Sequence, residues 1–438
     1  MSKSVTKSET AVVSYQSYKE ENYESKTIQL SSPMLHIGGE VSRLNPFEYV
    51  QTSSKVYLPH QEALAKTLHR QSAKFIDDYV DTIEKRQNID GLLKQALGED
   101  WITAKSPDGI PIFPDIRPKW TLEEGQRVTD IRPMIRNGMG QLYIPGSSIK
   151  GAIRTAIAYY LLKHAEKYKV PNSHRVSAIE EQLRSKLDNN QINNRNKSSL
   201  DDDLFINNLF TNYSLHYQGK NIPTRNIQNT DFLRAIKVSD SQPLIRKTVT
   251  VKKTGKKLFY NVPIIAETIV SSHFEDFNAK YRASIFAEVV YQAKTEFTLK
   301  IDHDMLSWFK HNQGMKLPFN SIAELLKICQ EFAQEQWDGE YDYWQNIRNR
   351  RHRDFNLDFD LIRDFYEKEK CPYALRLGWG SGMNGTTIDW LLTDGLRSEI
   401  RDVCGIKSPG FQAPKSRRTI VNSRQEIRYV PGWTKFTV

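Results

Sequence analysis

The sequence predicts an α+β fold, and two observations support that prediction. Segments with the short pattern of β-strands interleave with segments whose apolar residues recur at helical spacing, in both halves of the chain. The 438 residues also include 8 tryptophans, 20 tyrosines and 19 phenylalanines, which supply large apolar areas for a core. A fold of one element type and a wholly disordered chain are therefore excluded.

The N-terminal half is predicted to extend from residue 26 to residue 170. A polar, evenly charged segment at 1–25 precedes it and is typical of a disordered tail. The first strand of this half is expected at Thr27–Ile37, with an interruption at Pro33. A second short strand is expected at Lys55–Pro59.

A helical insertion is predicted at about 60–100, where apolar residues recur at near-helical spacing without a proline. Residues 105–120 are rich in proline and are predicted to form a loop. An amphipathic helix that starts just after Pro145 and Gly146 completes the N-terminal half.

Residues 171–230 are predicted to be a helical, Asn-rich linker region, most polar at Asp188–Asp203. The C-terminal half, 231–438, is expected to contain a β-hairpin with a basic tip between Thr248 and Tyr260. Residues 321–370 have a largely helical pattern. Short strands around a glycine-rich loop are expected after them.

Positive charge is concentrated in two short windows. The chain has 62 Lys and Arg against 52 Asp and Glu, which gives a net charge of +10. Residues 241–260 contain six basic residues and no acid, and residues 411–438 contain six basic residues and one acid. Charge focused in this way indicates an anionic partner, either a nucleic acid or an anionic membrane surface.

Other features narrow the class of protein. No apolar run approaches the ~20 residues that span a bilayer, and the opening MSKSVTKSET lacks the apolar core of a signal peptide. Cys329, Cys371 and Cys404 form no CxxC pair. We therefore expect a cytoplasmic protein with reduced thiols, no membrane partner, no metal site and no cofactor.

The segment IPGSSIKGAIR, Ile144–Arg154, predicts a helix start that binds an anion. Ser147 or Ser148 can cap the helix, whose free N–H groups and dipole favour negative charge. Lys150 and Arg154 lie four residues apart and therefore share one face. An ordinary capped helix explains the same residues, and the spacing is not that of a P-loop.

The segment RLGWGSGMNGTT predicts a second anion site. Its glycines let the backbone approach a phosphate closely and let successive N–H groups form an anion-binding nest. A flexible surface loop is the alternative, which the flanking Arg376 and Trp379 make less favourable. The candidate RNA-binding residues of this segment are Arg376, Gly378, Gly380, Gly382 and Gly385.

A histidine stands before two glycines, Gly38 and Gly39, at the expected end of the first strand. As a general base in RNA cleavage, His36 needs a second catalytic group, and the sequence offers no convincing partner. A lone histidine is more often structural, so no catalytic residue is assigned. His352 lies among the arginines of Arg348–Asp354, where both a solvated helix face and a phosphate contact fit the pattern.

Two basic segments add candidate contacts to phosphates. The segment APKSRRTI lies near the C-terminus, and the other segment is the tip of the expected hairpin. The alternative for the APKSRRTI segment is that its charges only keep the protein surface solvated. The basic residues are Lys415, Arg417 and Arg418 in the first segment, and Lys252, Lys253, Lys256 and Lys257 in the second.

Taken together, these motifs resemble one family. LHIGG, LNPFEYV, KVYLP, IPGSSIKGAIR, LRAIKVSDS, the glycine-rich segment and a final PKSRR…PGW are similar to segments of RAMP-superfamily proteins of CRISPR systems. The order and wording are most similar to the fifth subunits of type III-A (Csm) effector complexes. IPGSSIKGAIR is typical of the superfamily, whereas its combination with LNPFEYV and the final segment indicates this subunit. The landmarks extend from about Pro33 to Trp433.

The resemblance implies RAMP-type ferredoxin-like (RRM-related) folds with helical insertions, which hold CRISPR RNA. It implies a subunit that caps the 3′ portion of the guide, supports guide maturation, contacts neighbouring RAMP backbone and small subunits, and meets target RNA when the complex is engaged. RNA contact is carried over to the HIGG segment, to the helix start and to the glycine-rich segment. The residues concerned are His36, Gly38, Gly39, Ser147, Ser148, Lys150, Arg154, Gly378, Gly380, Gly382 and Gly385.

We therefore expect a non-catalytic RNA-binding subunit in which Lys and Arg neutralise phosphates and backbone N–H groups fix the register. The basic hairpin tip is a candidate finger toward the guide or a neighbouring subunit. Two alternatives stay open: a metal-independent RAMP endoribonuclease with His36 as base and Lys150 stabilising charge, and a scaffold that binds RNA weakly. A target slicer is less favoured, because it needs an acidic residue in an RNA-facing loop that the sequence does not identify.

Overall fold

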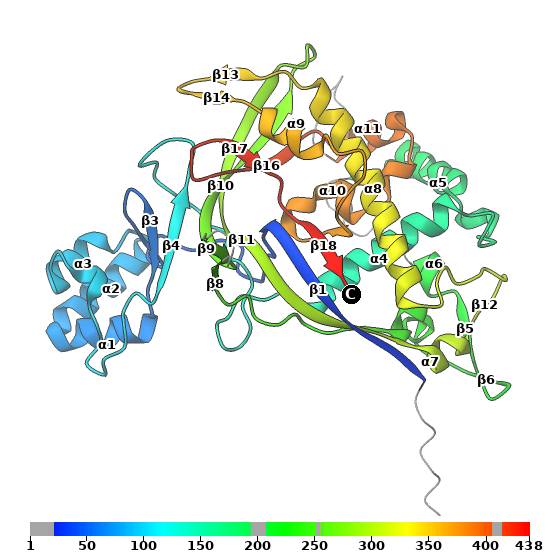
Figure 1. The fold of residues 1–438 in the computed structure, drawn as a ribbon, viewed down its shortest axis with the longest axis horizontal. Coiled ribbons are helices and arrows are strands. Elements are labelled where there is room, and N and C mark those ends of the chain that lie inside the picture. The colour runs from blue at the N-terminus through cyan, green and yellow to red at the C-terminus, as the bar shows by residue number, and fades with distance from the viewer. Residues whose placement is uncertain (1–21, 194–206, 251–254, 256, 405–413) are drawn as a thin grey trace, which may run out of the picture.

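A long, strongly curved β-sheet forms the middle of the molecule (Figure 1). The computed structural model describes residues 22–193, 207–250, 255, 257–404 and 414–438. Eleven strands within these residues share one sheet. They are β1 Tyr23–Leu35, β2 Val50–Gln51, β3 Lys55–Leu58, β4 Asp115–Trp120, β7 Ile236–Val238, β10 Val262–His273, β11 Ala279–Asp302, β15 Leu375–Arg376, β16 Arg417–Val421, β17 Ile427–Tyr429 and β18 Trp433–Thr437.

The order of strands joins the two ends of the chain. Along the sheet the order is β15-β18-β1-β11-β10-β4-β3-β2, while β7 pairs with β11 and β16 pairs with β10 and β17. β1 pairs with β11 from Tyr23 to Leu35 and with β18 from Gln29 to Ser31. β1, from the predicted N-terminal half, therefore lies between two strands of the predicted C-terminal half.

The first strand differs from its prediction at both ends and in the middle. It begins at Tyr23, inside the predicted tail, because the end of β11 offers a partner there. It also continues through Pro33, which has no N–H to donate. The paired register omits Pro33, and Gln292 on β11 has a φ of 52° close to this point. A local irregularity in the partner strand thus accommodates the proline.

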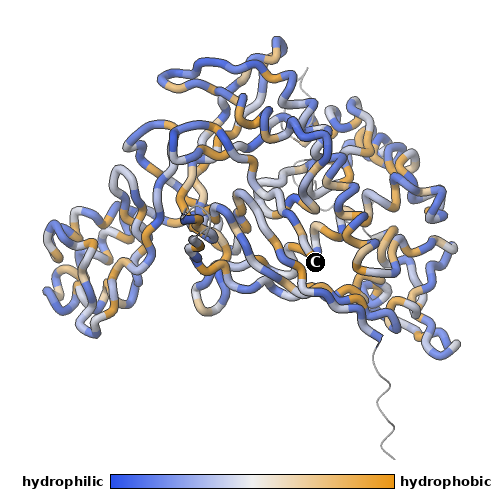
Figure 2. Tube along the Cα trace, in the orientation of Figure 1, coloured by the Kyte–Doolittle hydropathy of each residue, from blue (hydrophilic) through white to orange (hydrophobic). Residues whose placement is uncertain are grey.

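A small helical unit projects from one edge of the sheet (Figure 1). Its helices are α1 Gln61–Gln71, α2 Ala73–Glu84 and α3 Asp90–Leu97, which confirms the helical insertion predicted at 60–100. They pack with β2 and β3 around a core of their own that includes Leu64, Leu68 and Trp101. Figure 2 shows hydrophilic and hydrophobic residues alternating around these helices, as expected for a unit with one buried face.

The proline-rich segment 105–120 is not entirely a loop, because β4 occupies its last six residues. β4 pairs antiparallel with β3 and parallel with β10. Its proline, Pro118, pairs with Lys55 of β3, whereas pairing with β10 begins only at Lys119. Pro118 therefore lies at a position of β4 where pairing with β10 has not started, so its missing N–H costs no hydrogen bond to that strand.

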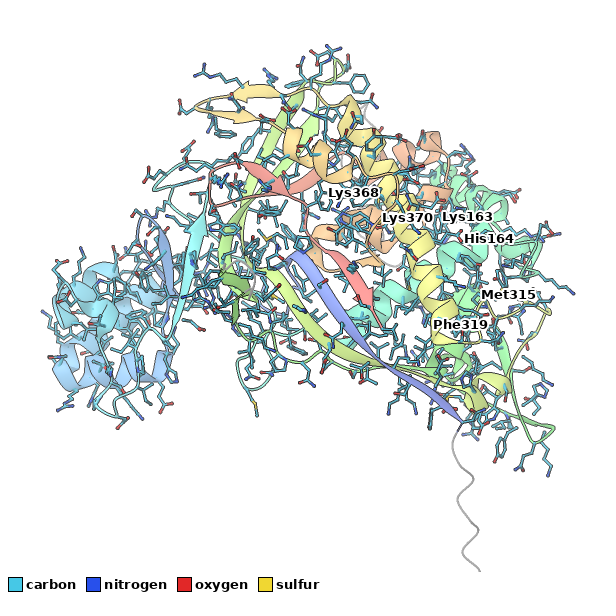
Figure 3. The ribbon with its side chains drawn as sticks, viewed as in Figure 1. Lys163, His164, Met315, Phe319, Lys368 and Lys370 are labelled. Carbon is cyan, nitrogen blue, oxygen red and sulfur yellow. The ribbon has the colours of Figure 1, made fainter. Side chains whose placement is uncertain are left out.

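Two long helices, α4 Gly146–Lys163 and α8 Ile322–Asn346, pack against each other and against the sheet. Ile149, Ile153 and Ile157 form the buried side of α4. At the end of α4, Lys163 and His164 face α8, where His164 Nε2 donates to Glu331 at 2.7 Å (Figure 3). The other helices are α5 Val176–Asp188, α6 Asn207–Phe210, α7 His303–Trp308, α9 Asp360–Tyr366, α10 Gly382–Thr386 and α11 Asp394–Val403.

The predicted linker 171–230 is partly ordered. It holds α5 and the strands β5 Tyr213–Tyr217 and β6 Lys220–Ile222, which form a small sheet with β12 Phe309–His311. Aromatic packing orders this region, because Tyr213 is buried against Phe232. The Asn-rich residues 194–203 lie outside the described residues.

Among the described residues, two hairpins form two-stranded sheets of their own outside the large sheet. The predicted basic hairpin is confirmed as β8 Lys247–Thr250 and β9 Lys257–Tyr260, although Lys252, Lys253 and Lys256 of its tip lie outside the described residues. The second hairpin, β13 Arg350–His352 and β14 Phe355–Leu357, occupies the segment for which a helix face was considered. α8 ends at Asn346, and Arg353 makes the turn with a φ of 52°. No helix in the described part of the chain is long and apolar enough to cross a bilayer.

Candidate nucleic-acid interface

The end of β1 carries the HIGG segment to the centre of the site. His36 is 3% exposed, and its Nδ1 donates to the carbonyl oxygen of Glu288 at 2.7 Å. Burial is the main cause that lowers the pKa of His36, although the Glu288 carbonyl and charge oppose it. Gly38 and Gly39, directly after it, are exposed. The imidazole is therefore enclosed and neutral, while the two glycines present bare backbone to solvent.

A buried carboxylate fixes the layer beneath this segment. Glu288 on β11 accepts from Arg117 Nε at 3.0 Å, from Arg136 Nη2 at 2.7 Å and from the Met134 N–H at 3.1 Å. Burial by itself raises the pKa of Glu288, but the charges of Arg136 and Arg117 outweigh it, and the net pKa is lowered. The ionised carboxylate thus ties β4 and residues 134–136 to the sheet.

Trp379 lies at the centre of a cluster of cations. The guanidinium of Arg132 is 5.3 Å from its ring centroid and that of Arg418 is 4.5 Å away. His36 contacts the same ring edge-on at 5.6 Å. Arg418 also donates to the Trp379 carbonyl at 3.1 Å, which holds the half-buried indole in place. A half-buried aromatic ring with two guanidinium groups is chemistry suited to a nucleobase and its phosphates.

The charges of Arg132 and Arg418 are not neutralised within the described residues. Among the described residues, the ion pairs near Trp379 are formed by Arg117, Arg136, Arg376 and Arg417. Neither Arg132 nor Arg418 takes part in one of them. Burial, and then the charges of Arg376 and Arg132, lower the pKa of Arg418. Cations that repel one another in this way favour the arrival of an anion.

The glycine-rich segment is folded and packed, so the alternative of a flexible surface loop is wrong for it. Gly378 and Gly382 have φ values of 79° and 64°, which only glycine adopts readily. A Cβ on Gly378 would overlap the His36 carbonyl oxygen, and one on Gly380 would overlap Pro431. The short helix α10 follows, with Gly385 packed on Ser381. The glycines thus let this segment pack directly on the HIGG strand end.

A small polar pocket of about 120 Å³ lies beside Gly380 and Gly382. Its buried carboxylate, Glu340 on α8, is 2.8 Å from Arg417 Nε and 3.8 Å from Arg376 Nη1. Because both guanidinium groups share one carboxylate, the pocket keeps a positive charge. Arg376 and Arg417 are therefore enclosed in the protein, and their predicted contact with RNA requires a phosphate that enters this pocket.

We expect Gly378→Ala to unfold the site. The change combines a strained φ, worth about 1–3 kcal/mol, with overlap on the His36 carbonyl, worth about as much again. Gly98→Ala is the matched control, because Gly98 has nearly the same backbone angles but open space around it. Urea unfolding should show a larger loss of stability for Gly378→Ala. Equal losses would contradict the packing role.

The start of α4 is occupied by the protein itself, which corrects the predicted capping. Neither Ser147 nor Ser148 caps the helix, because both lie inside its first turn. The Gly146 N–H instead donates to the carboxylate of Asp240 at 2.7 Å. Lys150 donates to the Ile236 carbonyl at 2.8 Å, and burial lowers its pKa. The anion expected at this helix start is thus an aspartate of the LRAIKVSDS segment.

Arg154 is likewise engaged inside the protein. It forms an ion pair with Asp231 and lies over the ring of Phe210 at 4.3 Å. We expect Arg154→Ala to lower the free energy of unfolding by about 1–3 kcal/mol, because Asp231 loses its partner in a half-buried place. Arg184→Ala, which breaks an exposed pair with Glu399, serves as the control in urea unfolding.

The predicted RNA contact of Arg154 has a separate test on the same variant. Loss of one phosphate contact reduces the slope of log affinity against log salt by about 0.7 for single-stranded RNA. A slope equal to that of the unmodified protein would limit Arg154 to its structural role.

Comparison with known families decides the class of the protein. The family model described as RAMPs, RAMP superfamily, matches residues 27–347. The chain belongs to the RAMP superfamily. The resemblance to the RAMP superfamily stated from the motifs is thereby confirmed, and the matched region contains most of β1, the helical unit, α4 and the β10–β11 pair.

Individual relatives agree with this RAMP assignment. The CRISPR system Cms protein Csm5 of Enterococcus italicus is 29% identical over 138 residues, which cover 28% of this chain and 39% of that protein. The match thus spans about two fifths of that relative's length.

Solved structures confirm the α+β RAMP fold. A crystal structure of T. onnurineus Csm5 matches with a TM-score of 0.54 and 17% identity, over 94% of this chain and 100% of that chain. A chain in a cryo-EM structure of a Csm-crRNA-target RNA ternary complex of a type III-A CRISPR-Cas system matches with a TM-score of 0.59 and 18% identity, over the same shares. At these identities the likeness concerns the fold.

The remaining predicted contacts of this RAMP protein belong to segments other than that of Trp379. Lys257 is exposed on β9. Lys415 lies close to Lys280 and Arg282, whose charges help to lower its pKa after the larger effect of burial. These positions are not part of the Trp379 cluster, so their contact with RNA stays a prediction.

Sequence reasoning did not select Arg132, and it mentioned Trp379 only as a flanking residue. Both lie in the part of the RAMP fold where β1, the segment after β4 and the glycine-rich segment meet. A signal for Arg132 was present, because Arg127, Arg132 and Arg136 recur within ten residues that lack an acid other than Asp130.

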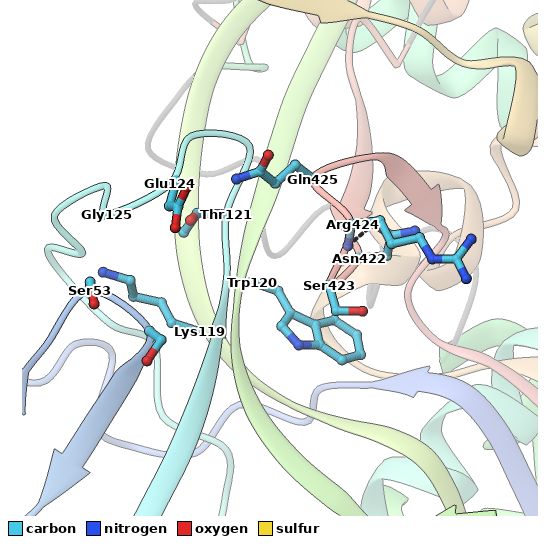
Figure 4. A pocket seen from close by; sticks show the side chains of 11 residues that line it. Ser53, Lys119, Trp120, Thr121, Glu124, Gly125, Asn422, Ser423, Arg424 and Gln425 are labelled. Carbon is cyan, nitrogen blue, oxygen red and sulfur yellow. Dashed lines mark hydrogen bonds between the residues drawn. The ribbon is translucent and has the colours of Figure 1, made fainter.

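A cleft of about 350 Å³ lies between the end of β4 and the β16–β17 turn (Figure 4). Two of the polar side chains that line it are engaged within the RAMP fold. Lys119 donates to the carbonyl oxygens of Thr52 and Gln126, and Asn422 holds its own turn through the N–H of Arg424. The described residues also contain no cluster of His, Cys, Asp and Glu suited to a metal ion. The Trp379 cluster is therefore the stronger candidate site.

Proposed function

We propose that this RAMP protein is a non-catalytic RNA-binding subunit of a type III-A Csm effector complex. In this proposal it holds CRISPR RNA, caps the 3′ portion of the guide and supports guide maturation in antiviral defence, within the cytoplasm. The relatives named Csm5 and the Csm-crRNA-target RNA ternary complex support the assignment to such a complex. The proposed partners are CRISPR RNA, target RNA in the engaged complex, and neighbouring RAMP backbone and small subunits.

The observation that carries the proposal is the cluster of Trp379, Arg132 and Arg418 beside the exposed Gly38 and Gly39. The indole offers a surface on which a base can stack, and the two guanidinium groups can neutralise adjacent phosphates. The bare glycine backbone allows close approach of the sugar-phosphate chain. None of these contacts reads a base edge, so binding is expected to be independent of guide sequence.

The endoribonuclease alternative receives less support. A general base must come within hydrogen-bond reach of a 2′-hydroxyl. His36 is enclosed beneath Trp379 with its Nδ1 engaged, and Lys150 donates to a backbone carbonyl at the start of α4. We therefore assign neither residue a catalytic role.

Crosslinking tests the proposal on the assembled complex. Ultraviolet crosslinking of the complete Csm complex with its guide, followed by sequencing of the RNA and mass spectrometry of the peptides, should join the Trp379 peptide to the 3′ portion of the guide. A footprint of this subunit at the 5′ end would overturn the capping assignment. Absence of any RNA crosslink to this subunit would favour the scaffold alternative.

A further inference from the structure

A second basic surface lies at the far end of the β10–β11 hairpin, apart from the Trp379 cluster. There β13 and β14 lie beside the hairpin end (Figure 1). The Arg348 N–H donates to the Phe277 carbonyl oxygen at 2.8 Å, and the Arg348 carbonyl oxygen accepts from the Ala279 N–H at 2.8 Å. We call residues 273–282 and 348–357 together the arm. Figure 2 shows the β13–β14 part of the arm as largely hydrophilic. The Arg348–Asp354 segment, whose role the sequence left open, thus belongs to a defined surface.

The arm carries more positive than negative charge. Its basic residues are Lys280, Arg282, Arg348, Arg350, Arg351 and Arg353, against Glu275, Asp276 and Asp354. None of these six forms an ion pair with a carboxylate of the described residues. Asp276 is engaged within its own turn, because it accepts from the backbone N–H of Asn278 at 3.0 Å and from the side-chain amide of that residue. The excess positive charge therefore faces outward.

Aromatic rings alternate with these cations. The ring of Phe274 has Lys280 Nζ at 4.6 Å and the Arg350 guanidinium at 4.6 Å. Phe277 is 45% exposed and stacks on His273 with ring centroids 5.3 Å apart. A further stack joins Tyr281 and His352 at 4.6 Å. Single-stranded nucleic acid is bound by cations together with aromatic faces on which bases stack. An acidic protein segment would need the cations alone, so the aromatic rings favour nucleic acid as the ligand.

The arm also continues the surface of the Trp379 cluster. Arg418 pairs with Val270 on β10, four residues before Phe274. Four residues of strand span about 13 Å, so the two surfaces lie within reach of one strand of RNA.

We propose that the arm is a second contact surface for single-stranded RNA, which binds phosphates through Lys280 and Arg350 and stacks a base on Phe277. The proposal extends the proposed function and shares with it only the premise that the ligand is RNA. The surface adds affinity without base-edge recognition, since its groups are cations and ring faces.

A salt series on the full-length protein tests the arm. The double variant Lys280→Ala/Arg350→Ala should reduce the slope of log affinity against log salt by about 1.4, because two phosphate contacts are lost at about 0.7 each. Phe277→Ala should weaken binding about 5- to 100-fold with an unchanged slope. The probe is a labelled single-stranded RNA of unstructured sequence, and circular dichroism checks that each variant is folded.

The control and the background make the result decisive. Arg70→Ala/Lys74→Ala removes two exposed cations from α1 and α2 and should leave the slope unchanged. The double variant of the arm should reduce the salt slope also when Trp379→Ala is present. The test of the arm therefore does not depend on whether Trp379 binds RNA. An unchanged slope overturns the proposal. If the arm variant, and neither the control nor the unmodified protein, fails to bind a polyglutamate peptide while it still binds RNA, the arm is assigned to an acidic protein segment instead.

Discussion

Trp379→Ala is expected to weaken RNA binding about 10- to 100-fold. Stacking of a base on an aromatic ring contributes about 1–3 kcal/mol, and each 1.4 kcal/mol corresponds to a tenfold change in affinity. The indole is half-buried beside Arg132 and Arg418, so its loss also removes the contact of the two guanidinium groups with the ring. Fluorescence anisotropy with a labelled single-stranded RNA measures the effect.

Trp308→Ala provides the control for this prediction. Trp308 is also half-buried and contacts an aromatic ring, Tyr217 at 5.0 Å, but it lies on α7 away from the glycine-rich segment. Trp379→Phe should retain part of the affinity, because a smaller aromatic face remains. If Trp379→Ala and Trp308→Ala bind RNA equally well, the cluster is not the RNA site.

Glu288→Gln is expected to destabilise the protein by about 3–5 kcal/mol. Removing one partner of a buried ion pair leaves the others with uncompensated charge in a low-dielectric place. Here two guanidinium groups, of Arg117 and Arg136, would lose their common carboxylate at 3.0 and 2.7 Å. Urea unfolding measures the loss, and Glu62→Gln, which breaks an exposed pair with Lys66, should behave like the unmodified protein.

The same residue predicts a dependence on pH. Because the pKa of Glu288 is lowered in the folded state, the unfolded chain binds more protons between the two pKa values. Its contribution to stability is therefore complete above the unfolded value of about 4.3 and is lost as pH falls toward the folded value. Glu288→Gln should lack this part of the acid sensitivity. A parallel decline in acid for both proteins would contradict the role of the ion pair.

The sequence predicted the elements better than their partners. The helical insertion, the α4 helix and the basic hairpin were each visible in periodicity or turn residues, which are local signals. β4 was hidden, because Pro118 is tolerated only through its position beside β10. The shared sheet was also hidden, since pairing between β1 and β18 depends on contacts that no local pattern reports.

The candidate site, too, could be predicted from the sequence only in part. The glycines of the glycine-rich segment were selected as positions where the backbone approaches a phosphate, and in the structure Gly378 instead approaches the carbonyl oxygen of His36. Contact of these glycines with RNA stays a prediction. Which cations remain unpaired could not be read from the sequence. Lys150 and Arg154 have the spacing of a phosphate site, yet Asp231 lies beside Arg154 and Asp240 at the helix start. Arg132, in contrast, contacts the Trp379 ring and takes part in none of the ion pairs found among the described residues.

β1 is synthesised long before the strands with which it pairs in the sheet. β1 leaves the ribosome before both of its partners, because β11 ends only at Asp302 and β18 follows later still. At about 5–20 residues per second, the strand waits on the order of tens of seconds with both edges unpaired. Exposed edges of this kind invite pairing with other chains. Protection of the nascent chain during that interval is therefore expected to limit how much of this protein a cell can produce.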